Sequence, residues 1–321
     1  METKDKLIEA FTSLMIEKIN NLTEDFTTPW INIRGFKPRN INGRKYSAGN
    51  YFLLAFLCEL RKYNFPIFLT FKQAKEKNLS INKGEKAYPV YYYNRYFKHR
   101  TTGENINSDE YMLLTPEAKN EYKKIMFLKY FNVFNIDQTN FKEVYPAEYE
   151  KYQEEKDSYN PQTNGFICPE IDEMLLLNSW YCPIHIKESN RAFYSPKLDY
   201  ITNPLKEQFP NGEDFYTTLL HEIAHSTGHK DRLDRNFAKS IDEIDIYAIE
   251  ELTAELTSAI VGSILNIAVE PREQNAAYLN SWLSCLKEKP EYLFTILGAV
   301  SKATDLMMTK INIEVLEEVE N

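Results

Sequence analysis

Two histidines separated by three residues are the first sign of chemistry in this chain. They lie in the sequence His221-Glu222-Ile223-Ala224-His225. On a helix, residues four positions apart project from the same face, so both imidazoles can reach one metal ion. Glu222 follows the first histidine, where its carboxylate can act on a water molecule instead of binding the metal. The motif predicts a zinc hydrolase site, with His221 and His225 as metal ligands and Glu222 as the general base.

A zinc ion that keeps one position open for water needs a third protein ligand. Glu251 is the first candidate, because it lies in an acidic run on a downstream helix whose small residues permit close approach to the histidines. Glu251 and Glu255 are four residues apart, and a like-charge pair at this spacing is unfavourable unless a cation or an imidazolium relieves it. One of them could therefore bind the metal while the other holds a histidine N–H.

Three residues remain alternatives for the third ligand or for an outer support of the site. Asp231 fits the spacing H-E-x-x-H-x-x-G-x-x-D, in which a glycine turn brings a further ligand round. His229 belongs to a group of three histidines within nine residues of a chain that has five in all. Glu255 is the third alternative.

These ligand types predict a peptide hydrolase. One zinc ion per chain would lower the pKa of a bound water molecule to about 7, and Glu222 would take its proton as general base. Glu222 would then pass the proton to the leaving amine. Tyr247 is a candidate donor to the oxyanion, although packing is the simpler explanation for one tyrosine among 22.

A basic and aromatic block precedes this site. Residues 31–100 contain 15 Lys or Arg against 3 Asp or Glu, together with 15 Phe or Tyr. Cations that bind phosphates and rings that stack on bases are typical of single-strand binding. The rival interpretation is a basic surface that recruits the acidic second half of the chain or an acidic protein. The candidate DNA-binding residues are Lys37, Arg39, Arg44, Lys45, Tyr46, Lys72, Lys75, Lys83, Lys86, Tyr92 and Arg95.

The elements around the histidine motif follow a zincin order. The motif lies in a helix predicted over Phe215–Thr227, and Gly228 is placed to end it. A small antiparallel sheet is predicted before this helix, over Ile184–Lys187, Arg191–Tyr194 and Leu198–Ile201. Further helices are expected over Pro169–Ser179, Ile244–Ile267, Gln274–Lys287 and Pro290–Lys310.

The first part of the chain predicts a mixed α/β region. The expected helices are Met1–Leu22, Tyr51–Tyr63 and, as a short helix or turn, Phe71–Lys77. The expected strands are Ile67–Thr70, Ala87–Tyr93 and Lys129–Ile136. Tyr145–Lys156 has no clear pattern, and the polar, turn-forming residues of Asp157–Gly165 favour a linker. We therefore predict an α+β protein with two domains, over residues 1–157 and 166–321.

Composition favours a globular protein of the cytoplasm. The chain has 321 residues, of which 43% are hydrophobic, more than one domain of about 150 residues normally uses. The four cysteines are far apart and form no C-x-x-C pair, which indicates a reducing compartment. No run of 18 apolar residues occurs, and the first 22 residues lack a signal-peptide cleavage site, so no membrane partner is expected.

Several motifs resemble those of the ArdC-type antirestriction proteins of plasmids and phages. In the first region these motifs are Pro38–Asn40, Gly43–Tyr46, Gly49–Asn50, Leu69–Ala74, Lys83–Lys86 and Val133–Asn135. In the second region they are His221–Arg235 and Glu250–Glu255. The motifs occur in the order of that family and cover most of the chain.

The resemblance implies an N-terminal domain that binds single-stranded DNA and a C-terminal zincin-like metallopeptidase domain. It also implies a gluzincin-like ligand set in which the helical carboxylate is Glu251. The expected partners are single-stranded DNA and a protein or peptide substrate, so that DNA binding would bring a protease to DNA-bound proteins or shield entering DNA from nucleases. Two alternatives remain, a DNA-protecting module without catalysis and a metal-stabilised interaction scaffold.

Overall fold

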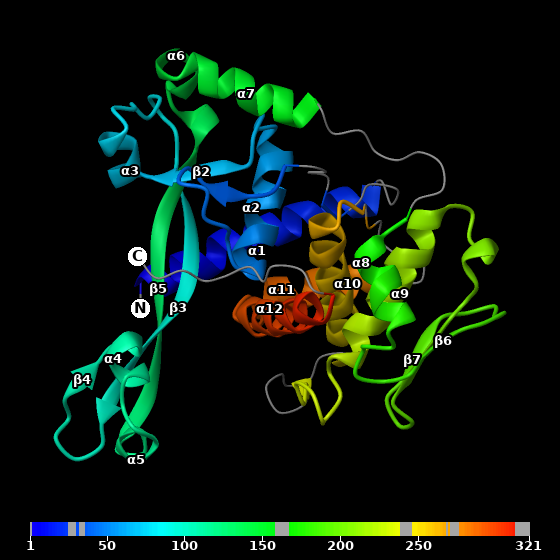
Figure 1. Ribbon diagram of the computed structural model, residues 1–321. Helices are drawn as coiled ribbons and strands as arrows, with labels where there is room; N and C mark the ends of the chain where they lie inside the picture. Colours follow the sequence, from blue (N-terminus) through cyan, green and yellow to red (C-terminus); the bar gives the residue numbers. More distant parts are fainter. Residues whose placement is uncertain are drawn as a thin grey trace.

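The computed structural model describes residues 2–24, 30–31, 36–157, 167–237, 246–267, 269 and 276–311. It confirms the α+β class: a larger and a smaller sheet lie on either side of a group of long helices (Figure 1). None of the described helices combines the length and the apolar character needed to cross a membrane.

The larger sheet belongs to the first half of the chain, and its strands are ordered β1-β2-β5-β3-β4. Its bounds are β1 Arg39–Asn40, β2 Ile67–Thr70, β3 Tyr88–His99, β4 Asn105–Ile106 and β5 Tyr122–Asn135. The antiparallel ladder of β3 and β5 runs from Tyr88 opposite Val133 to His99 opposite Tyr122. The strands predicted at these places are confirmed, but both continue well beyond their predicted ends.

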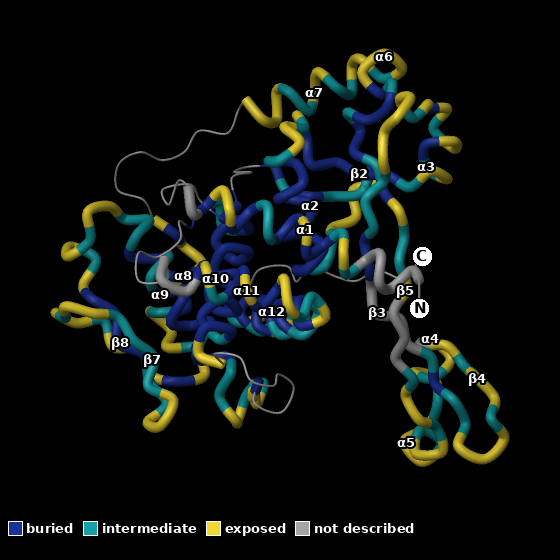
Figure 2. Tube along the Cα trace, turned by 180° about the vertical axis from the view of Figure 1, so that it is seen from behind, coloured by how far each residue is buried: buried dark blue, intermediate teal, exposed yellow. Residues whose placement is uncertain are grey.

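The continuation of β3 and β5 is a two-stranded ribbon that extends away from the body of the molecule (Figures 1 and 2). We call the ladder from Tyr91–Tyr130 to His99–Tyr122 the ribbon, and residues 100–121 its tip. The tip contains β4 and two short helices, α4 Ser108–Met112 and α5 Pro116–Lys119. Its residues are largely exposed, as the yellow segments of Figure 2 show.

The remaining helices of the first half flank the sheet body. They are α1 Glu2–Glu24, α2 Ala48–Arg61, α3 Phe71–Glu76, α6 Phe141–Val144 and α7 Pro146–Asp157, with a 3-10 turn over Ile136–Gln138. The start of α3 is set by a capping box, because the Thr70 hydroxyl accepts the Gln73 N–H while the Gln73 side chain accepts the Thr70 N–H. α7 fills the stretch that had no clear sequence pattern, and it buries none of its residues.

The second half contains the smaller sheet and the other long helices. They are α8 Pro169–Leu176, β6 Ile184–Ile186, β7 Phe193–Ser195, β8 Tyr200–Asn203, α9 Gly212–Ser226, α10 Ile246–Ile264, α11 Ala276–Glu288 and α12 Tyr292–Lys310, with a 3-10 turn over Lys206–Gln208. The prediction of an antiparallel sheet is wrong for one pair. β8 lies between β6 and β7, pairing parallel with β6 and antiparallel with β7, because the chain crosses over from β6 before it forms the β7–β8 hairpin.

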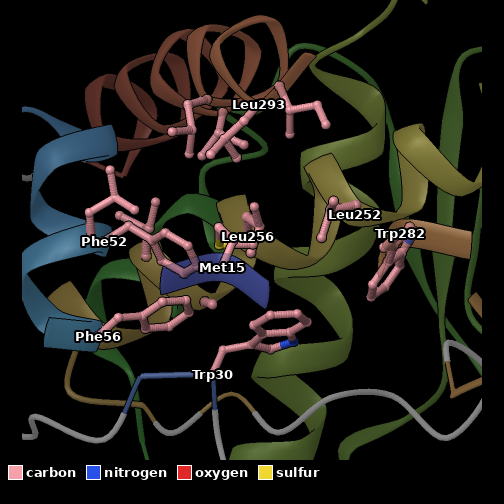
Figure 3. Packing of buried hydrophobic residues seen from close by; sticks show 14 of the residues in the cluster. Met15, Trp30, Phe52, Phe56, Leu252, Leu256, Trp282 and Leu293 are labelled. Atoms are coloured by element: carbon pink, nitrogen blue, oxygen red, sulfur yellow. The ribbon is translucent and has the colours of Figure 1, made fainter. Parts of the chain in front are cut away.

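The largest hydrophobic core draws on both halves of the chain. Met15 of α1 and Phe52 and Phe56 of α2 lie in one buried cluster with Leu252 and Leu256 of α10 (Figure 3).

Tryptophans and one main-chain contact tie this core together. The Trp30 ring packs 6.1 Å, centroid to centroid, from the Trp282 ring of α11. The backbone N–H of Trp30 donates to the carbonyl of Val269. The indole N–H of Trp282 donates to the carbonyl of Ala248 at the start of α10. The helices of the first half therefore share an interior with the helix that follows the histidine motif.

Some predicted features lie outside the described residues. The proposed linker Asp157–Gly165 is described only at its first residue, and the predicted helix starts at Ile244 and Gln274 also fall in gaps. The domain limits at 157 and 166 therefore stay a prediction.

Candidate metal centre

The histidine motif lies on α9, whose position is set at both ends. At the start, the Asn211 side chain accepts the Asp214 N–H at 2.9 Å, a standard N-cap interaction. Along the helix, Phe215, Leu219 and Leu220 are buried in the core beneath the smaller sheet. This packing turns the opposite, polar side of the helix toward α10.

The end of α9 is held by Arg235, which the chain brings back beside the last turn. Its guanidinium donates to the carbonyl of Ala224 at 3.1 Å and to the hydroxyl of Thr227 at 2.8 Å. A Cβ on Gly228 would lie only 3.0 Å from this guanidinium, so a larger residue would have to displace the Arg235 side chain by a few tenths of an ångström. The helix itself ends at Ser226, two residues before Gly228.

The two motif histidines face one another across one turn of α9. Their Nε2 atoms are 3.0 Å apart, and their rings meet edge to face with centroids 4.6 Å apart. The His221 side chain is 2% exposed and that of His225 is 15% exposed. Both nitrogens therefore point to one place at the edge of the buried helix.

Glu251 of α10 completes a triangle of ligand atoms. Its Oε2 lies 3.4 Å from His221 Nε2, and its Oε1 lies 3.4 Å from His225 Nε2. His221, His225 and Glu251 each offer one ligand atom within 4.8 Å of the others. Atoms that bind one ion at about 2.0–2.2 Å from tetrahedral corners stand roughly 3.3–3.6 Å apart. The donor set and its spacing thus fit a divalent metal ion with an open fourth position.

Charges around the triangle favour the ionised carboxylate. Burial acts to raise the pKa of Glu251, but hydrogen bonds and charges from His221 and His225 outweigh it and hold that pKa well below its usual value. Burial likewise opposes protonation of His225, yet neighbouring carboxylates raise its pKa to about 9. A cation is therefore strongly attracted to this place, whether it is a proton or a metal ion.

Glu250 is a supporting residue that the sequence reasoning missed. Its Oε1 lies 3.3 Å from His225 Nδ1, the ring nitrogen that faces away from the triangle. The guanidinium of Arg235 holds the same carboxylate, donating from Nε to Oε2 at 2.8 Å and from Nη2 to Oε1. Despite burial, these contacts lower the pKa of Glu250. The only signal in the sequence was its place beside Glu251.

The other candidate ligands lie around the triangle and not in it. Glu255 Oε1 is 4.0 Å from His221 Nδ1, on the outer side of that ring. His229 Nδ1 is 3.9 Å from Asp199 Oδ2 and 3.6 Å from Asp231 Oδ2. The Asp231 side chain is 73% exposed and points to solvent.

Glu222 is positioned by the edge strand of the smaller sheet. The backbone N–H of Tyr194 on β7 donates to Glu222 Oε2 at 2.9 Å. The β7–β8 hairpin is fixed in turn by Arg232, which donates from Nη1 to Asp199 Oδ2 at 3.1 Å and from Nη2 to Tyr194 Oη at 3.1 Å. Sequence reasoning also missed this anchor, since Asp199 and Arg232 are 33 residues apart.

A cavity of about 600 Å³ opens over these groups. Its walls come from β7, α9, the loop after α9 and the start of α10. Tyr247, the candidate oxyanion donor, lines it with 58% of its surface exposed. A volume of this size is within the range of ligand-binding pockets.

The candidate DNA-binding residues divide into exposed and packed groups. Among the packed ones, Arg39 lies over the Phe36 ring at 4.6 Å and pairs with Glu155 at 3.2 Å. Tyr46 meets Phe68 edge-on at 6.3 Å, and burial raises its pKa.

Of the other cations whose side chains the structure describes, all but one lie at the surface. Lys37 is half-buried, and burial lowers its pKa. Tyr92 and Arg95 lie on β3, with side chains outside the described part of the structure. The exposed cations are Arg44 and Lys45 in a turn, Lys72 and Lys75 on α3, and Lys83 and Lys86 in the loop after α3.

Comparison with known proteins finds a family match for each half of the chain. Residues 5–134 match the family described as the N-terminal domain of anti-restriction factor ArdC, and residues 170–298 match a zincin-like metallopeptidase family. A DNA primase TraC of Escherichia coli is 30% identical over 315 residues, which are 96% of this chain but 27% of the primase. The chain thus spans about a quarter of that relative. Protein y4eC of Sinorhizobium fredii is 26% identical over 95% of this chain and 92% of its own length.

Solved structures agree in fold over nearly the whole chain. The metal-free crystal structure of antirestriction ArdC protein from plasmid R388 superposes with a TM-score of 0.70 at 29% identity, covering 96% of this chain and 99% of that one. Its Mn(II)-bound structure gives a TM-score of 0.66 at 27% identity, covering 95% and 98%. Both regions occur in the same order in one continuous match, so the chain combines an N-terminal ArdC-type domain with a zincin-like metallopeptidase domain and is similar to the antirestriction ArdC protein over nearly its whole length.

Proposed function

We propose that this protein is a metal-dependent peptidase that also binds single-stranded DNA, and that it acts on proteins bound to that DNA. The observation that carries the proposal is the convergence of His221, His225 and Glu251 beside Glu222, whose carboxylate stays outside the triangle of ligand atoms. A zincin-like domain supplies the scaffold for such a site. The Mn(II)-bound state of the R388 protein supports a divalent ion.

Zinc is the ion that we assign to the site, one per chain. Two imidazoles and one carboxylate with an open position are the donor set of catalytic zinc in His-His-Glu peptidases. Glu250 holds the outer nitrogen of His225, which fixes the ring in the orientation that presents Nε2. Glu255 Oε1 lies 4.0 Å from the outer nitrogen of His221, so it acts on the second ring through its charge and not through a hydrogen bond.

The roles of the chain's own residues follow from their positions. When bound, the metal supplies a water molecule of lowered pKa and polarises the substrate carbonyl. Glu222 takes the proton of the attacking water and later delivers it to the leaving amine. The N–H of Tyr194 holds one oxygen of Glu222, so the other oxygen faces the reacting groups. Tyr247 lies in the cavity wall as a donor to the developing oxyanion.

The DNA-binding part of the proposal rests on charge and on the family match. Exposed cations gather on the turn before α2, on α3 and on the loop after it. The matched region is the N-terminal domain of an antirestriction factor, and one relative is named a DNA primase. We assign protection of incoming DNA of a mobile element to this region. The four cysteines, all free and buried, fit a reducing cytoplasm.

One experiment with the full-length protein separates the possible outcomes. Wild type and Glu222→Gln are dialysed against zinc, their metal content is measured, and each is incubated with a DNA-binding protein on a single-stranded oligonucleotide. We expect equal metal content, cleavage by wild type only, and DNA binding by both. DNA protection without cleavage in either protein would favour a non-catalytic module. Metal with neither activity would favour a scaffold, and wild type without metal would overturn the peptidase proposal.

A further inference from the structure

The ribbon of β3 and β5 has an unusual charge pattern. The two strands together contain five Lys or Arg, eleven Phe or Tyr and no Asp or Glu. The tip between them reverses this sign, with two Lys or Arg against five Asp or Glu over residues 100–121. The excess of positive charge is therefore a property of the ribbon itself.

Two lysines lie directly opposite one another in the ladder. Lys98 of β3 pairs with Lys123 of β5, and Lys123 is exposed. Like charges at directly opposite positions destabilise a sheet. Within the described parts of the chain, no carboxylate pairs with Lys98, Lys123 or the neighbouring Lys124. The protein therefore maintains a repulsive arrangement that a bound anion would relieve.

The two faces of the ribbon differ in what covers them. On one face Phe97 stacks on Tyr111 of α4, with ring centroids 3.6 Å apart and planes within 4°. Because side chains alternate along a strand, Lys98 and Lys123 project from the other face. Tyr96 lies two residues from Lys98 on that same face and is partly exposed. Lys98, Lys123 and Tyr96 thus share one face, which we call the open face; Lys123 is exposed there and the other two are half-buried.

Protection of exposed strand edges does not account for this pattern. Charged side chains of either sign prevent edge-to-edge pairing, yet these strands use only positive ones. The nine residue pairs of the ribbon, from Tyr91–Tyr130 to His99–Tyr122, span about 30 Å at roughly 3.4 Å per residue. A ribbon of this length offers several cations in a row, as a polyphosphate backbone requires, with rings between them for unstacked bases.

We propose that the open face of this ribbon, bearing Tyr96, Lys98 and Lys123, is a principal contact surface for single-stranded nucleic acid. The inference rests on the proposed DNA binding and places it on an element outside the exposed cations of α3 and its neighbouring loops. Lys124 lies on the opposite face of β5 and contributes to the same field.

The test compares three variants of the full-length protein, each with three lysines changed to glutamine. The ribbon variant changes Lys98, Lys123 and Lys124, and the body variant changes Lys72, Lys83 and Lys86. The remote variant changes the exposed residues Lys187, Lys197 and Lys302 and serves as the charge-matched control. Binding of a labelled oligothymidine of about 20 nucleotides, longer than most single-strand sites, is measured over a range of salt concentrations.

The ribbon variant should bind at least tenfold more weakly than the remote variant. Its slope of log affinity against log salt should fall by about 1.4, because Lys98 and Lys123 lie on the contact face and each lost phosphate contact on a single strand removes about 0.7. Changing the same three lysines to arginine should preserve binding, which separates loss of charge from a folding defect. Thermal unfolding and circular dichroism of each variant provide the second check.

Three results would overturn the inference in distinguishable ways. If wild type binds with a steep salt dependence and the ribbon variant behaves like the remote variant, the ribbon has no such role while the proposed DNA binding stands. If wild type does not bind the oligonucleotide, both the role of the ribbon and the proposed DNA binding are wrong. Polyglutamate that displaces the oligonucleotide at equal charge concentration would identify an acidic protein as the partner and reject the inference.

Discussion

The backbone N–H of Tyr194 donates a 2.9 Å hydrogen bond to Oε2 of Glu222. This contact joins the edge strand of the smaller sheet to the residue that we propose as general base. It fixes the carboxylate without neutralising it, because the donor is a neutral main-chain amide. Strand β7 therefore belongs to the proposed catalytic apparatus through its backbone and not through a side chain.

Shortening Glu222 tests this positioning. Glu222→Asp retains a carboxylate but removes one methylene, so the group cannot hold the Tyr194 N–H and reach the substrate together. Since a misplacement of about 1 Å can cost on the order of 100-fold, we expect kcat for peptide cleavage to fall about 10- to 100-fold with unchanged metal content. Steady-state kinetics and metal analysis provide the measurement. Full activity in the aspartate variant would show that the contact does not position the base.

Removing the charge of Glu250 should weaken metal binding. Its carboxylate faces His225 Nδ1 at 3.3 Å, and loss of such an outer partner typically reduces metal affinity about 10- to 100-fold. Competition with a chromophoric zinc chelator measures the zinc affinity of the Glu250→Gln variant. As the matched control, Glu188→Gln removes an exposed carboxylate and should leave the zinc affinity unchanged. Equal affinity in the two variants would exclude the supporting role.

Arg232 should stabilise the β7–β8 hairpin in a pH-dependent way. Its side chain is 4% exposed and holds Asp199, so Arg232→Ala should lower the free energy of unfolding by about 1–3 kcal/mol at pH 7. Hydrogen bonding to Arg232 lowers the folded-state pKa of Asp199 below 3.8. The stabilisation is therefore complete above pH 4 or so and is lost as pH falls through the lowered value. Urea unfolding should show a smaller stability difference between wild type and Arg232→Ala at pH 3 than at pH 7. The control variant Lys197→Ala should be about as stable as wild type at both pH values.

Asp305 on α12 should destabilise the folded protein at neutral pH. Burial raises the pKa of its carboxyl from 3.8 to about 6. The unfolded chain releases this proton more readily, so stability falls as pH rises from about 4 to about 6, and the penalty persists above that range. Asp305→Asn should raise the free energy of unfolding by about 1–2 kcal/mol at pH 8, allowing for partial exposure, and by little at pH 4. A variant that is less stable than wild type at pH 8 would contradict this assignment.

The sequence predicted those elements whose signals are local. β2 has its predicted bounds, and α9 has the expected apolar side and two histidines at helical spacing, although it begins at Gly212, three residues before its predicted start, because Asn211 caps it. The placement of Glu251 beside the histidines also agrees with expectation, because its helix has small residues at the contact. In each case neighbouring residues in the chain contain the necessary information.

Features that depend on distant contacts were not predictable in this way. Glu250 matters only because Arg235 and His225 both reach it, and nothing in its own neighbourhood separates it from Glu251 or Glu255. The ribbon escaped prediction because the sequence of its outer part, at Arg95–His99 and Tyr122–Ile125, does not alternate regularly between apolar and polar residues. The parallel pairing of β6 with β8 depends on a crossover that strand patterns do not specify.

Both halves of the chain contribute side chains to one hydrophobic interior, and this limits how the molecule can be divided. Helix α10 presents Glu251 to the histidines and Leu252 and Leu256 to the amino-terminal helices. A fragment ending at residue 157 would leave Phe52 and Phe56 without the leucines that now cover them, and water would reach that surface. Each half of the chain therefore covers apolar surface of the other, so we expect that neither half would keep its native structure if it were excised or replaced by the corresponding half of a relative.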